Sequence, residues 1–320
     1  MKLFEHPDFE QAVIRAAEHF QGTGWRPAFI EKDYFATEAL RLIADAAGDK
    51  VIFKGGTSLS KGWNLIERFS EDLDLFLDPI AFDPPLGKNA INRELKKLSD
   101  KVAAHPAFSF LPAESCTIGG FGRCDRFEYV QRFVELGGVV NRILCEVGTA
   151  SGREPTEVVS LQSCVGRFLQ ETRSSMGAED EGAFTLRLLH FRRTFVEKMF
   201  AIHSKVQLWL RDGQPVGAYA RHYYDLFQLA GRPEVEEMLR SAEYTAIKAD
   251  YDQISKVHFF KSYFQPENMS FSGSPALFPS PELAAELCGH YERECNSLCY
   301  GPFPTWADVQ ARFLHLQPLL

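Results

Sequence analysis

The sequence predicts a mixed α/β protein of the α+β type, in which a mixed sheet flanked by helices precedes a mainly helical C-terminal part. Three observations lead to this fold class. Short apolar runs of strand length alternate with helical patterns in the first half of the chain. Acids and leucines alternate over residues 72–75, and beyond residue 183 apolar residues recur mostly at helical spacing. We expect a sheet domain with an N-terminal helix over residues 1–171 and a helical domain over residues 183–320.

Local patterns define the elements of the sheet domain in order. Residues 31–47 carry apolar side chains at helical spacing and stop at Gly48, a residue type that commonly ends helices. Residues 51–53 form an apolar run typical of a buried strand. A helix over residues 58–67 would return the chain to the strand at 72–77. The remaining elements are a connection over 79–88, a helix over 89–104, and strands over 127–134 and 141–147 that form a hairpin around Gly137 and Gly138.

The glycine pair Gly55 and Gly56 precedes two hydroxyl residues, Thr57 and Ser58, at the expected start of a helix. Backbone N–H groups at a helix start have no partner within the helix, and the helix dipole places positive potential there. Glycines carry no side chain that would keep an anion away. The segment therefore predicts a phosphate-binding loop that holds a triphosphate.

Asp72 and Asp74 lie two positions apart in a predicted strand, so their side chains share one face while Leu73 and Leu75 enter the core. Two neighbouring carboxylates repel each other unless a cation joins them. Magnesium prefers hard oxygen ligands and keeps its other positions for water and substrate phosphates. We expect the pair to bind one or two Mg²⁺ ions, which would neutralise charge on a transferred phosphoryl group.

Each half of this segment has an ordinary explanation. A glycine pair after a strand is usually a turn, and an Asp-x-Asp pattern is usually two solvated acids. Their occurrence together and in this order favours a shared site. The loop is not a Walker A motif, because it lacks the four-residue gap and the Gly-Lys-Ser/Thr ending, so a P-loop ATPase is not expected.

Residues 55–61 and 68–75 closely resemble two motifs of the AbiEii/AbiGii family of nucleotidyltransferase toxins, a branch of the polymerase-beta-like superfamily. In that family a third motif carries a helical lysine and a fourth carries a helical arginine and aspartate. Lys198 matches the third motif, and Arg221 with Asp225 matches the fourth. The sequence departs from the pattern at His222, where many relatives have an acid. The resemblance extends from Gly55 to Leu226 and implies a nucleotidyltransferase-type sheet.

The resemblance implies a metal-dependent enzyme that moves a nucleoside monophosphate from an NTP to an acceptor hydroxyl and releases pyrophosphate. In the family the acceptor is typically the 3′ end of tRNA, where added nucleotides stop translation, and a cognate antitoxin restrains the enzyme. The protein would then be the toxin of a toxin–antitoxin, or abortive infection, system. Catalysis would depend on positioning and electrostatics.

The resemblance also implies roles for individual residues. Asp72 and Asp74 would hold the metal ions, and Lys198 and Asp225 would complete the catalytic set by contributing to the cleft. Asp225 would orient the lysine or the metal. The residues expected to bind the nucleotide are Gly55, Gly56, Thr57, Ser58, Lys61 and Arg221.

Glu146 lies near the end of the strand at 141–147, among residues that look buried. Nucleotidyltransferases of the resembled superfamily often place a third carboxylate on such a strand. There it accepts the proton of the attacking hydroxyl or shares the metals. A simple strand-end acid is an equal alternative.

Bulk composition is that of a globular protein, with 320 residues, 45% hydrophobic content and a net charge of −8. No apolar stretch reaches the length of a membrane helix, and the N-terminus lacks a basic then apolar leader, so we expect a cytoplasmic protein without a membrane partner. The seven scattered cysteines indicate reduced thiols. The negative net charge argues against indiscriminate nucleic-acid binding.

A local excess of positive charge offers a place for RNA. Between residues 187 and 221, seven basic residues face only Glu197 and Asp212 as acids. They would form a positive rim that accepts an RNA end, although solvated helix faces explain the same charges. The basic residues are Arg187, Arg192, Arg193, Lys198, Lys205, Arg211 and Arg221.

The polar residues 172–182 predict a mobile loop that separates the sheet from the helical remainder. Helices are then expected over residues 195–210 and 219–230. Lys198 would lie at the edge of an apolar stripe on the first of them. On the second, Arg221 and Asp225 have the spacing of an ordinary intrahelical ion pair, which would also explain them.

Two features of the tail have tempting functional explanations. Cys288, Cys295 and Cys299 near His290 follow helical steps of seven and four, so we expect one buried stripe and not a zinc site. The aromatic side chains between residues 259 and 264 are able to stack on bases, but core packing is the expected use. They are Phe259, Phe260, Tyr263 and Phe264.

The sequence thus favours a magnesium-dependent nucleotidyltransferase, with RNA, an NTP and an antitoxin as partners. A protein hydroxyl is the nearest alternative acceptor. A catalytically inactive module that binds nucleotide or antitoxin is the other alternative. Because both acids of the Asp72 and Asp74 pair are present, catalysis is favoured.

Overall fold

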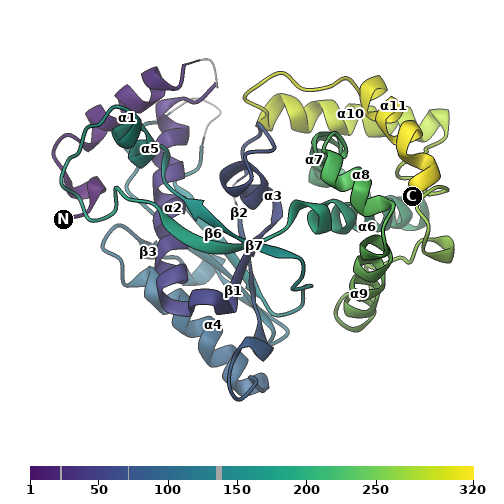
Figure 1. The fold of residues 1–320 in the computed structure, drawn as a ribbon, viewed down its shortest axis with the longest axis horizontal. Coiled ribbons are helices and arrows are strands. Elements are labelled where there is room, and N and C mark those ends of the chain that lie inside the picture. Colours follow the sequence, from purple (N-terminus) through teal and green to yellow (C-terminus); the bar gives the residue numbers. More distant parts are fainter. Residues whose placement is uncertain (22–23, 71, 135–138) are drawn as a thin grey trace. The chain divides into compact units, whose positions relative to one another are not determined.

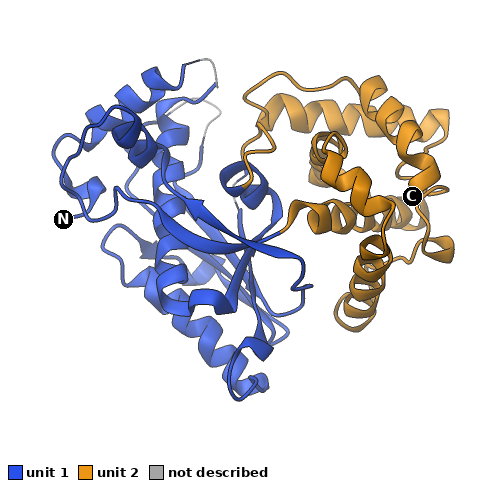
Figure 2. Cartoon of the chain, in the orientation of Figure 1, with its two compact units in different colours: residues 1–62, 70–189 blue, residues 63–69, 190–320 orange. Residues whose placement is uncertain are grey.

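The protein divides into two compact units, shown in separate colours in Figure 2. The computed structural model describes residues 1–21, 24–70, 72–134 and 139–320. One unit, here the sheet unit, comprises Met1–Gly62 and Ser70–Leu189. The other, the helical unit, comprises Trp63–Phe69 and His190–Leu320.

Eight strands formed by the described residues make one mixed sheet, which confirms the predicted fold class. Their order is β3-β5-β6-β2-β1-β8-β7, with β4 paired to β5. The pairs β1 with β8 and β2 with β6 are parallel, and the other pairs are antiparallel. The strands are β1 (Val51–Lys54), β2 (Asp72–Leu77), β3 (Ser109–Phe110), β4 (Cys116–Ile118), β5 (Gly122–Glu128), β6 (Arg142–Gly148), β7 (Thr156–Leu161) and β8 (Phe184–Leu189).

Strand β2 alternates as predicted. Leu73 and Leu75 are buried, whereas Asp72 and Asp74 on the opposite face are half-buried. Further along that face Phe76 packs in a core cluster with Ile52 and Leu189, so the acids occupy the accessible end of an otherwise buried surface.

Helices cover the sheet, as Figure 1 shows: α2 packs across β1, β6 and β8, and α4 packs against β5. Helix α2 starts with a proline, whose missing N–H costs nothing at the first helical position, and ends at Gly48 with φ +60°. The helices of this unit are α1 (Phe9–His19), α2 (Pro27–Ala47), α3 (Gly55–Thr57), α4 (Lys88–Ala103) and α5 (Cys164–Glu171).

The helix predicted over residues 58–67 is shorter than expected. α3 continues into one π-helical turn, Ser58–Gly62, and no helix follows it before β2 in the described residues. Instead, residues 67–69 pair with residues 298–300 through backbone hydrogen bonds around an isolated bridge between Arg68 and Cys299. Backbone groups that would have bonded within a helix therefore bond to residues 298 and 300, far along the sequence.

The predicted hairpin exists as the antiparallel pair β5 and β6, but its first strand lies earlier than residues 127–134. Pairing runs from Gly122 opposite Gly148 to Glu128 opposite Arg142. Beyond the paired residues, the Gln131 side chain donates hydrogen bonds to the backbone carbonyls of Phe133 and Val139, within the connection between the two strands. Gly137 and Gly138, the predicted turn, lie outside the described residues.

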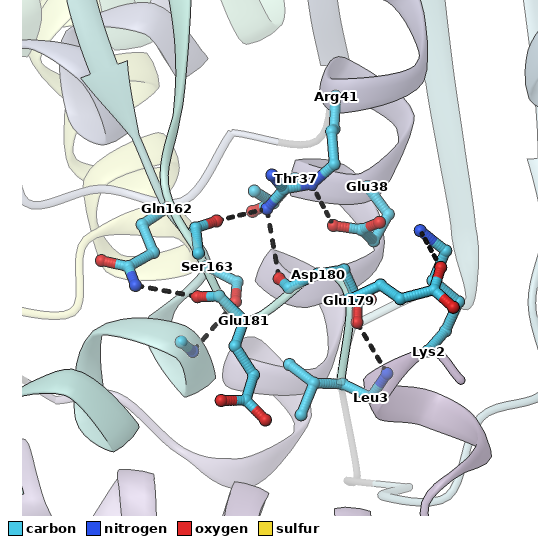
Figure 3. Close-up of polar contacts among 12 residues, drawn as sticks. Lys2, Leu3, Thr37, Glu38, Arg41, Gln162, Ser163, Glu179, Asp180 and Glu181 are labelled. Carbon is cyan, nitrogen blue, oxygen red and sulfur yellow. Dashed lines mark hydrogen bonds and ion pairs between the residues drawn. The ribbon is translucent and has the colours of Figure 1, made fainter. Parts of the chain in front are cut away.

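The polar segment 172–182 is held in place by buried contacts, contrary to the mobile loop expected there (Figure 3). Asp180 is fully buried and accepts hydrogen bonds from Leu3 N–H at 2.8 Å and from the Tyr34 hydroxyl at 2.6 Å. Arg41 donates to the carbonyl oxygens of Asp180 and Gly182. The chain then re-enters the sheet as β8, so the sheet unit continues beyond the expected boundary.

The helical unit is built on α6, which packs against α7, α8 and α9. Phe195, Met199, Ile202 and Val206 are buried along it, so the predicted apolar stripe is present. Of the helices in the described residues, none is both long and apolar enough to span a membrane. The helices of this unit are α6 (Phe191–Asp212), α7 (Arg221–Ala230), α8 (Pro233–Leu239), α9 (Ala242–His258), α10 (Pro281–Leu298) and α11 (Trp306–Leu316).

Candidate active site

Four neighbouring strands of the sheet unit place one row of side chains on a common face. In the strand register, Lys54 lies opposite Asp74, Asp74 lies beside Glu146, and Glu146 lies opposite Cys124. Directly paired residues project to the same side of a sheet, and Asp72 joins that side because it is two positions from Asp74. The three predicted carboxylates therefore share one face.

The glycine loop lies directly against this row. Gly55 adopts φ +74°, a conformation that strains other residues, and its missing Cβ leaves the space that the Asp74 carboxylate fills. A Cβ at this position would collide with Asp74 Oδ2 and lie 2.7 Å from Cγ. Gly55 and Asp74, two of the predicted site residues, thus fit closely against each other.

The hydroxyls of the loop hold the backbone together. Thr57 Oγ1 donates to the carbonyl of Asp72 at 2.5 Å, which ties α3 to the start of β2. Ser58 Oγ donates to the carbonyl of Gly55 at 2.9 Å, and both side chains are buried. These two side chains therefore shape the loop, and its backbone N–H groups remain the candidates for phosphate binding.

The pKa of Glu146 depends on its burial and on the two neighbouring aspartates. Burial raises its pKa, and the charges of Asp74 and Asp72 raise it further. The nearby Lys54 and a contact from the Cys124 thiol, whose Sγ lies 3.7 Å from Oε1, act in the opposite direction. The net shift is upward, with burial as its largest cause and the two aspartate charges as the next.

The donor set on this face suits magnesium. Within the described part of the chain, no group of three or more His, Cys, Asp or Glu side chains has the arrangement of a metal site. Magnesium, however, needs only one or two carboxylates when substrate phosphates and water supply its other ligands. Asp72 and Asp74 are the two carboxylates that such a site would use, and their charges contribute to the raised pKa of Glu146 beside them.

Lys61, predicted to balance the triphosphate charge, has a protein partner. Its Nζ lies 2.6 Å from Asp33 Oδ1 and also donates to the carbonyl of Gln162 at 3.2 Å. Lys54, which the sequence analysis did not assign to the site, stands opposite Asp74 in the register. Its place as the last residue of the strand before the glycine pair was the available signal.

In the helical unit, Asp225 connects two basic side chains. Its Oδ1 and Oδ2 accept from Nε and Nη2 of Arg68 at 2.6 and 2.7 Å, and Oδ2 also lies 2.7 Å from Lys198 Nζ. Asp225 is fully buried, and Arg68 and Lys198 are nearly so. Asp225 therefore contacts the lysine, as the resemblance implies, and its second partner is an arginine that precedes the acid pair.

Electrostatics keep this cluster ionised with a positive excess. Burial opposes ionisation of Asp225, but the charges of Arg68 and Lys198 hold its pKa well below the ordinary value. His222 Nδ1 lies 3.2 Å from Lys198 Nζ, and burial together with the lysine charge lowers the pKa of His222 to about 3. One acid, two bases and a neutral imidazole leave a net positive charge, which suits an anionic ligand.

The predicted site residues divide between the two units. The glycine loop, the acid pair, Lys61 and Glu146 belong to the sheet unit, and Lys198, Arg221 and Asp225 belong to the helical unit. Arg221 is half-buried at the start of α7. A single cleft that combines both groups stays a prediction.

The basic stretch between residues 187 and 221 is partly paired with acids that lie elsewhere in the sequence. Arg192 Nε lies 3.1 Å from Glu243, and Arg193 contacts Asp250 as well as Glu197. Lys198 is paired with Asp225, and Arg211 with Asp212. Tertiary ion pairs therefore involve three of the seven basic residues of the predicted positive rim.

The C-terminal cysteines form the expected buried stripe only in part. Cys295 is buried in α10, whereas Cys288 and Cys299 are partly exposed. The phenyl rings of Phe259 and Phe260 are 42% and 67% exposed, so core packing is the wrong explanation for these two residues.

Comparison with known proteins identifies relatives of this fold. The family model described as "Nucleotidyl transferase AbiEii toxin, Type IV TA system" matches residues 39–304. Among solved structures, the chain resembles MenT4, a nucleotidyltransferase toxin from Mycobacterium tuberculosis H37Rv, with a TM-score of 0.55 and 18% identity over 96% of this chain and 89% of that chain. At this identity the structural likeness shows the fold alone. The comparison with curated proteins gave no match.

The family match covers most of the chain and includes the glycine loop, the acid pair, Lys198 and Asp225. It agrees with the motifs in the sequence and with the placement of the acids beside the loop. The chain therefore belongs to the AbiEii family of nucleotidyltransferase toxins of type IV toxin–antitoxin systems.

Proposed function

We propose that the protein transfers a nucleoside monophosphate from an NTP to an acceptor hydroxyl, with Asp72 and Asp74 as ligands of Mg²⁺ and the glycine loop as the triphosphate site. The close fit between Gly55 and the Asp74 carboxylate carries this proposal. Phosphates bound by the loop backbone would lie beside the carboxylates, so that one cation contacts both. One or two magnesium ions would supply charge neutralisation at the transferred phosphoryl group.

The residues of the row have separate tasks in this reaction. Asp72 and Asp74 fix the position of the bound nucleotide, and the loop N–H groups orient its phosphates for in-line attack. Glu146, whose pKa is raised, takes the proton of the acceptor hydroxyl. The acceptor oxygen then bonds to the α-phosphorus while the bond to the bridging oxygen breaks, and pyrophosphate leaves.

The basic residues of the helical unit would serve the nucleotide as well. Lys198 belongs to a buried cluster with a net positive charge, and Arg221 begins the helix that carries Asp225. We propose that Lys198 and Arg221 balance the triphosphate charge and that Asp225 orients Lys198. Lys61 would contribute the same way if triphosphate binding released it from Asp33.

We propose the 3′ end of tRNA as the acceptor and a cognate antitoxin as the partner that restrains the enzyme. Family membership supports the antitoxin, because the family is described as toxins of a type IV toxin–antitoxin system. A protein hydroxyl would be the acceptor in the alternative proposal. Both proposals use the same row of carboxylates.

Incubation with labelled nucleotides tests the function. The purified chain is mixed with each labelled NTP and Mg²⁺, and with either total tRNA or lysate proteins. We expect label in tRNA, loss of label with Asp74→Ala, and full transfer with Asp100→Ala, a matched change of an exposed aspartate in α4. Label in protein alone would replace the tRNA proposal, and absence of transfer to either acceptor would favour the inactive module.

A further inference from the structure

The helical unit contains a polar cavity that the proposed reaction does not use. Its volume is about 550 Å³, within the range of small-ligand sites. Helix α6 contributes His203 and Gln207, one helical turn apart on one face, and the opposite wall comes from the segment between Phe264 and Pro275. Three carboxamides line the cavity: Gln207, Gln265 and Asn268.

These carboxamides are available to a ligand. The side chains of Gln207, Gln265 and Asn268 have no hydrogen-bond partner among the described residues, although each offers a donor group and an acceptor. The serine hydroxyls of the same wall are different, because Ser274 bonds His203 at 2.7 Å and Ser270 bonds Ser272 at 2.8 Å. The serines and His203 therefore bond within the cavity wall, whereas the three carboxamides are free to hydrogen-bond a ligand.

The charge of the cavity disfavours a phosphate as its ligand. Burial lowers the pKa of His203 to about 4, so this imidazole is neutral near pH 7. Glu267 is the one carboxylate among the described lining residues, and none of them is a lysine or arginine. This lining disfavours an anion, and its carboxamides match a ligand with donors and acceptors in its own plane.

One aromatic side chain lines the cavity, and two more lie just before it in the sequence. Phe264 lines the cavity, and the guanidinium of Arg211 lies over its ring with Cζ 5.1 Å from the ring centre. The preceding turn exposes Phe259 and Phe260, and it carries Lys261, for which the described residues provide no acidic partner. Exposed aromatic rings beside a basic residue are a feature of proteins that stack the bases of single strands.

We propose that this cavity binds an unpaired nucleobase of the RNA acceptor. Carboxamides of Asn and Gln pair with base edges, most effectively with adenine, and Phe264 with Arg211 provides a surface for stacking. The inference rests on the proposed function, since RNA must be the acceptor. Recognition of this kind depends on bases more than on phosphates, which suits a chain with a net charge of −8.

Equilibrium binding of a short unpaired RNA to the full chain tests this site. The variants are Gln207→Met, Gln265→Ala and Asn268→Gly, the last because glycine keeps the φ of +51° found at Asn268. Gln253→Met is the matched control, because Gln253 is an exposed carboxamide of α9 outside the cavity. We expect each cavity variant to weaken binding about threefold to tenfold, the effect of losing a ligand hydrogen bond, and the control to leave it unchanged.

Two further experiments distinguish a base of the RNA from the base of a free nucleotide. An abasic version of the RNA should bind wild type and variants equally. Free NTP should not compete for the cavity, as judged by an unchanged RNA affinity at saturating NTP without Mg²⁺. Unchanged RNA binding by the combined triple variant would overturn the proposal, and competition by free NTP would replace RNA with a free nucleotide. Because Asp74→Ala stops transfer independently, failure of the cavity and failure of the reaction are distinguishable.

Discussion

Arg68 and Asp225 form a two-pronged ion pair in the interior of the helical unit, with N–O distances of 2.6 and 2.7 Å. The arginine comes from the short segment that precedes β2, and the aspartate comes from α7. Backbone hydrogen bonds to residues 298 and 300 hold the same segment on either side of Arg68. The pair thus anchors the stretch of chain that leads to Asp72 and Asp74.

Removal of Arg68 alone should be strongly destabilising. Arg68→Met leaves Asp225 buried with Lys198 as its remaining cation, and loss of one partner of a buried pair costs about 3–5 kcal/mol. Urea unfolding measures the change. Arg240→Met, which removes an exposed pair in the same unit, is the control and should leave the midpoint unchanged. A similar midpoint for both variants would show that the buried pair does not hold the segment.

Gly55→Ala should affect the active site more than an equivalent change at a glycine without neighbours. Both Gly55 and Gly48 have positive φ, so alanine strains the backbone at each by about 1–3 kcal/mol. Only at Gly55 does the new methyl group meet Asp74, whereas nothing lies within 4 Å of a Cβ at Gly48. We expect nucleotide transfer to fall about a hundredfold in Gly55→Ala, as for a catalytic group misplaced by an ångström.

Gly48→Ala should lose a comparable amount of folding stability through backbone strain, but it should keep transfer near the wild-type rate. Rates measured below the unfolding temperature of both variants make the comparison. Equal rates in the two variants would mean that the contact between loop and acid has no part in catalysis.

Glu38 makes the stability of the sheet unit depend on pH. It is buried in α2 beside Arg41, as Figure 3 shows, and its Oε2 has no hydrogen-bond partner within the described structure. Burial raises the pKa of Glu38 to about 7, against the opposing charge of Arg41. A carboxyl with a raised pKa favours the folded state while it is protonated. Its contribution is complete below the unfolded value near 4.5 and is lost as the pH rises through 7.

Unfolding free energies between pH 5 and 8 should therefore decline by on the order of 2–3 kcal/mol from this group. Glu38→Gln, which keeps an oxygen for Arg41, should flatten that slope. An unchanged slope in Glu38→Gln would assign the pH dependence to other groups.

The sequence predicted the parts of the site that local patterns determine. The alternation of acids and leucines in β2 was enough to place Asp72 and Asp74 on one face, and the register with β6 adds Glu146 to it. The glycine pair predicted room for a phosphate, which stays a prediction, and the contact of Gly55 with the Asp74 carboxylate is an addition from the structure. Neighbouring residues decide such features, so a single sequence contains the information.

The parts that were missed depend on distant partners. Arg68 and Asp225 are 157 positions apart, and Glu243 and Asp250 reach the basic stretch from another helix. The polar segment at 172–182 resembled a mobile loop because the burial of Asp180 depends on Leu3 and Tyr34. Tertiary contacts of this kind change the charge and order of a segment without leaving a local pattern.

The coupling between metal and nucleotide tests the central claim most directly. Titration with Mn²⁺ and a non-hydrolysable NTP analogue measures how much each increases the affinity for the other, a reciprocal quantity. We predict at least tenfold coupling in the wild type, little in Asp74→Asn, and full coupling in Asp100→Asn. Wild-type coupling in Asp74→Asn would contradict the account, because the cation would then be held without the carboxylate that lies against Gly55.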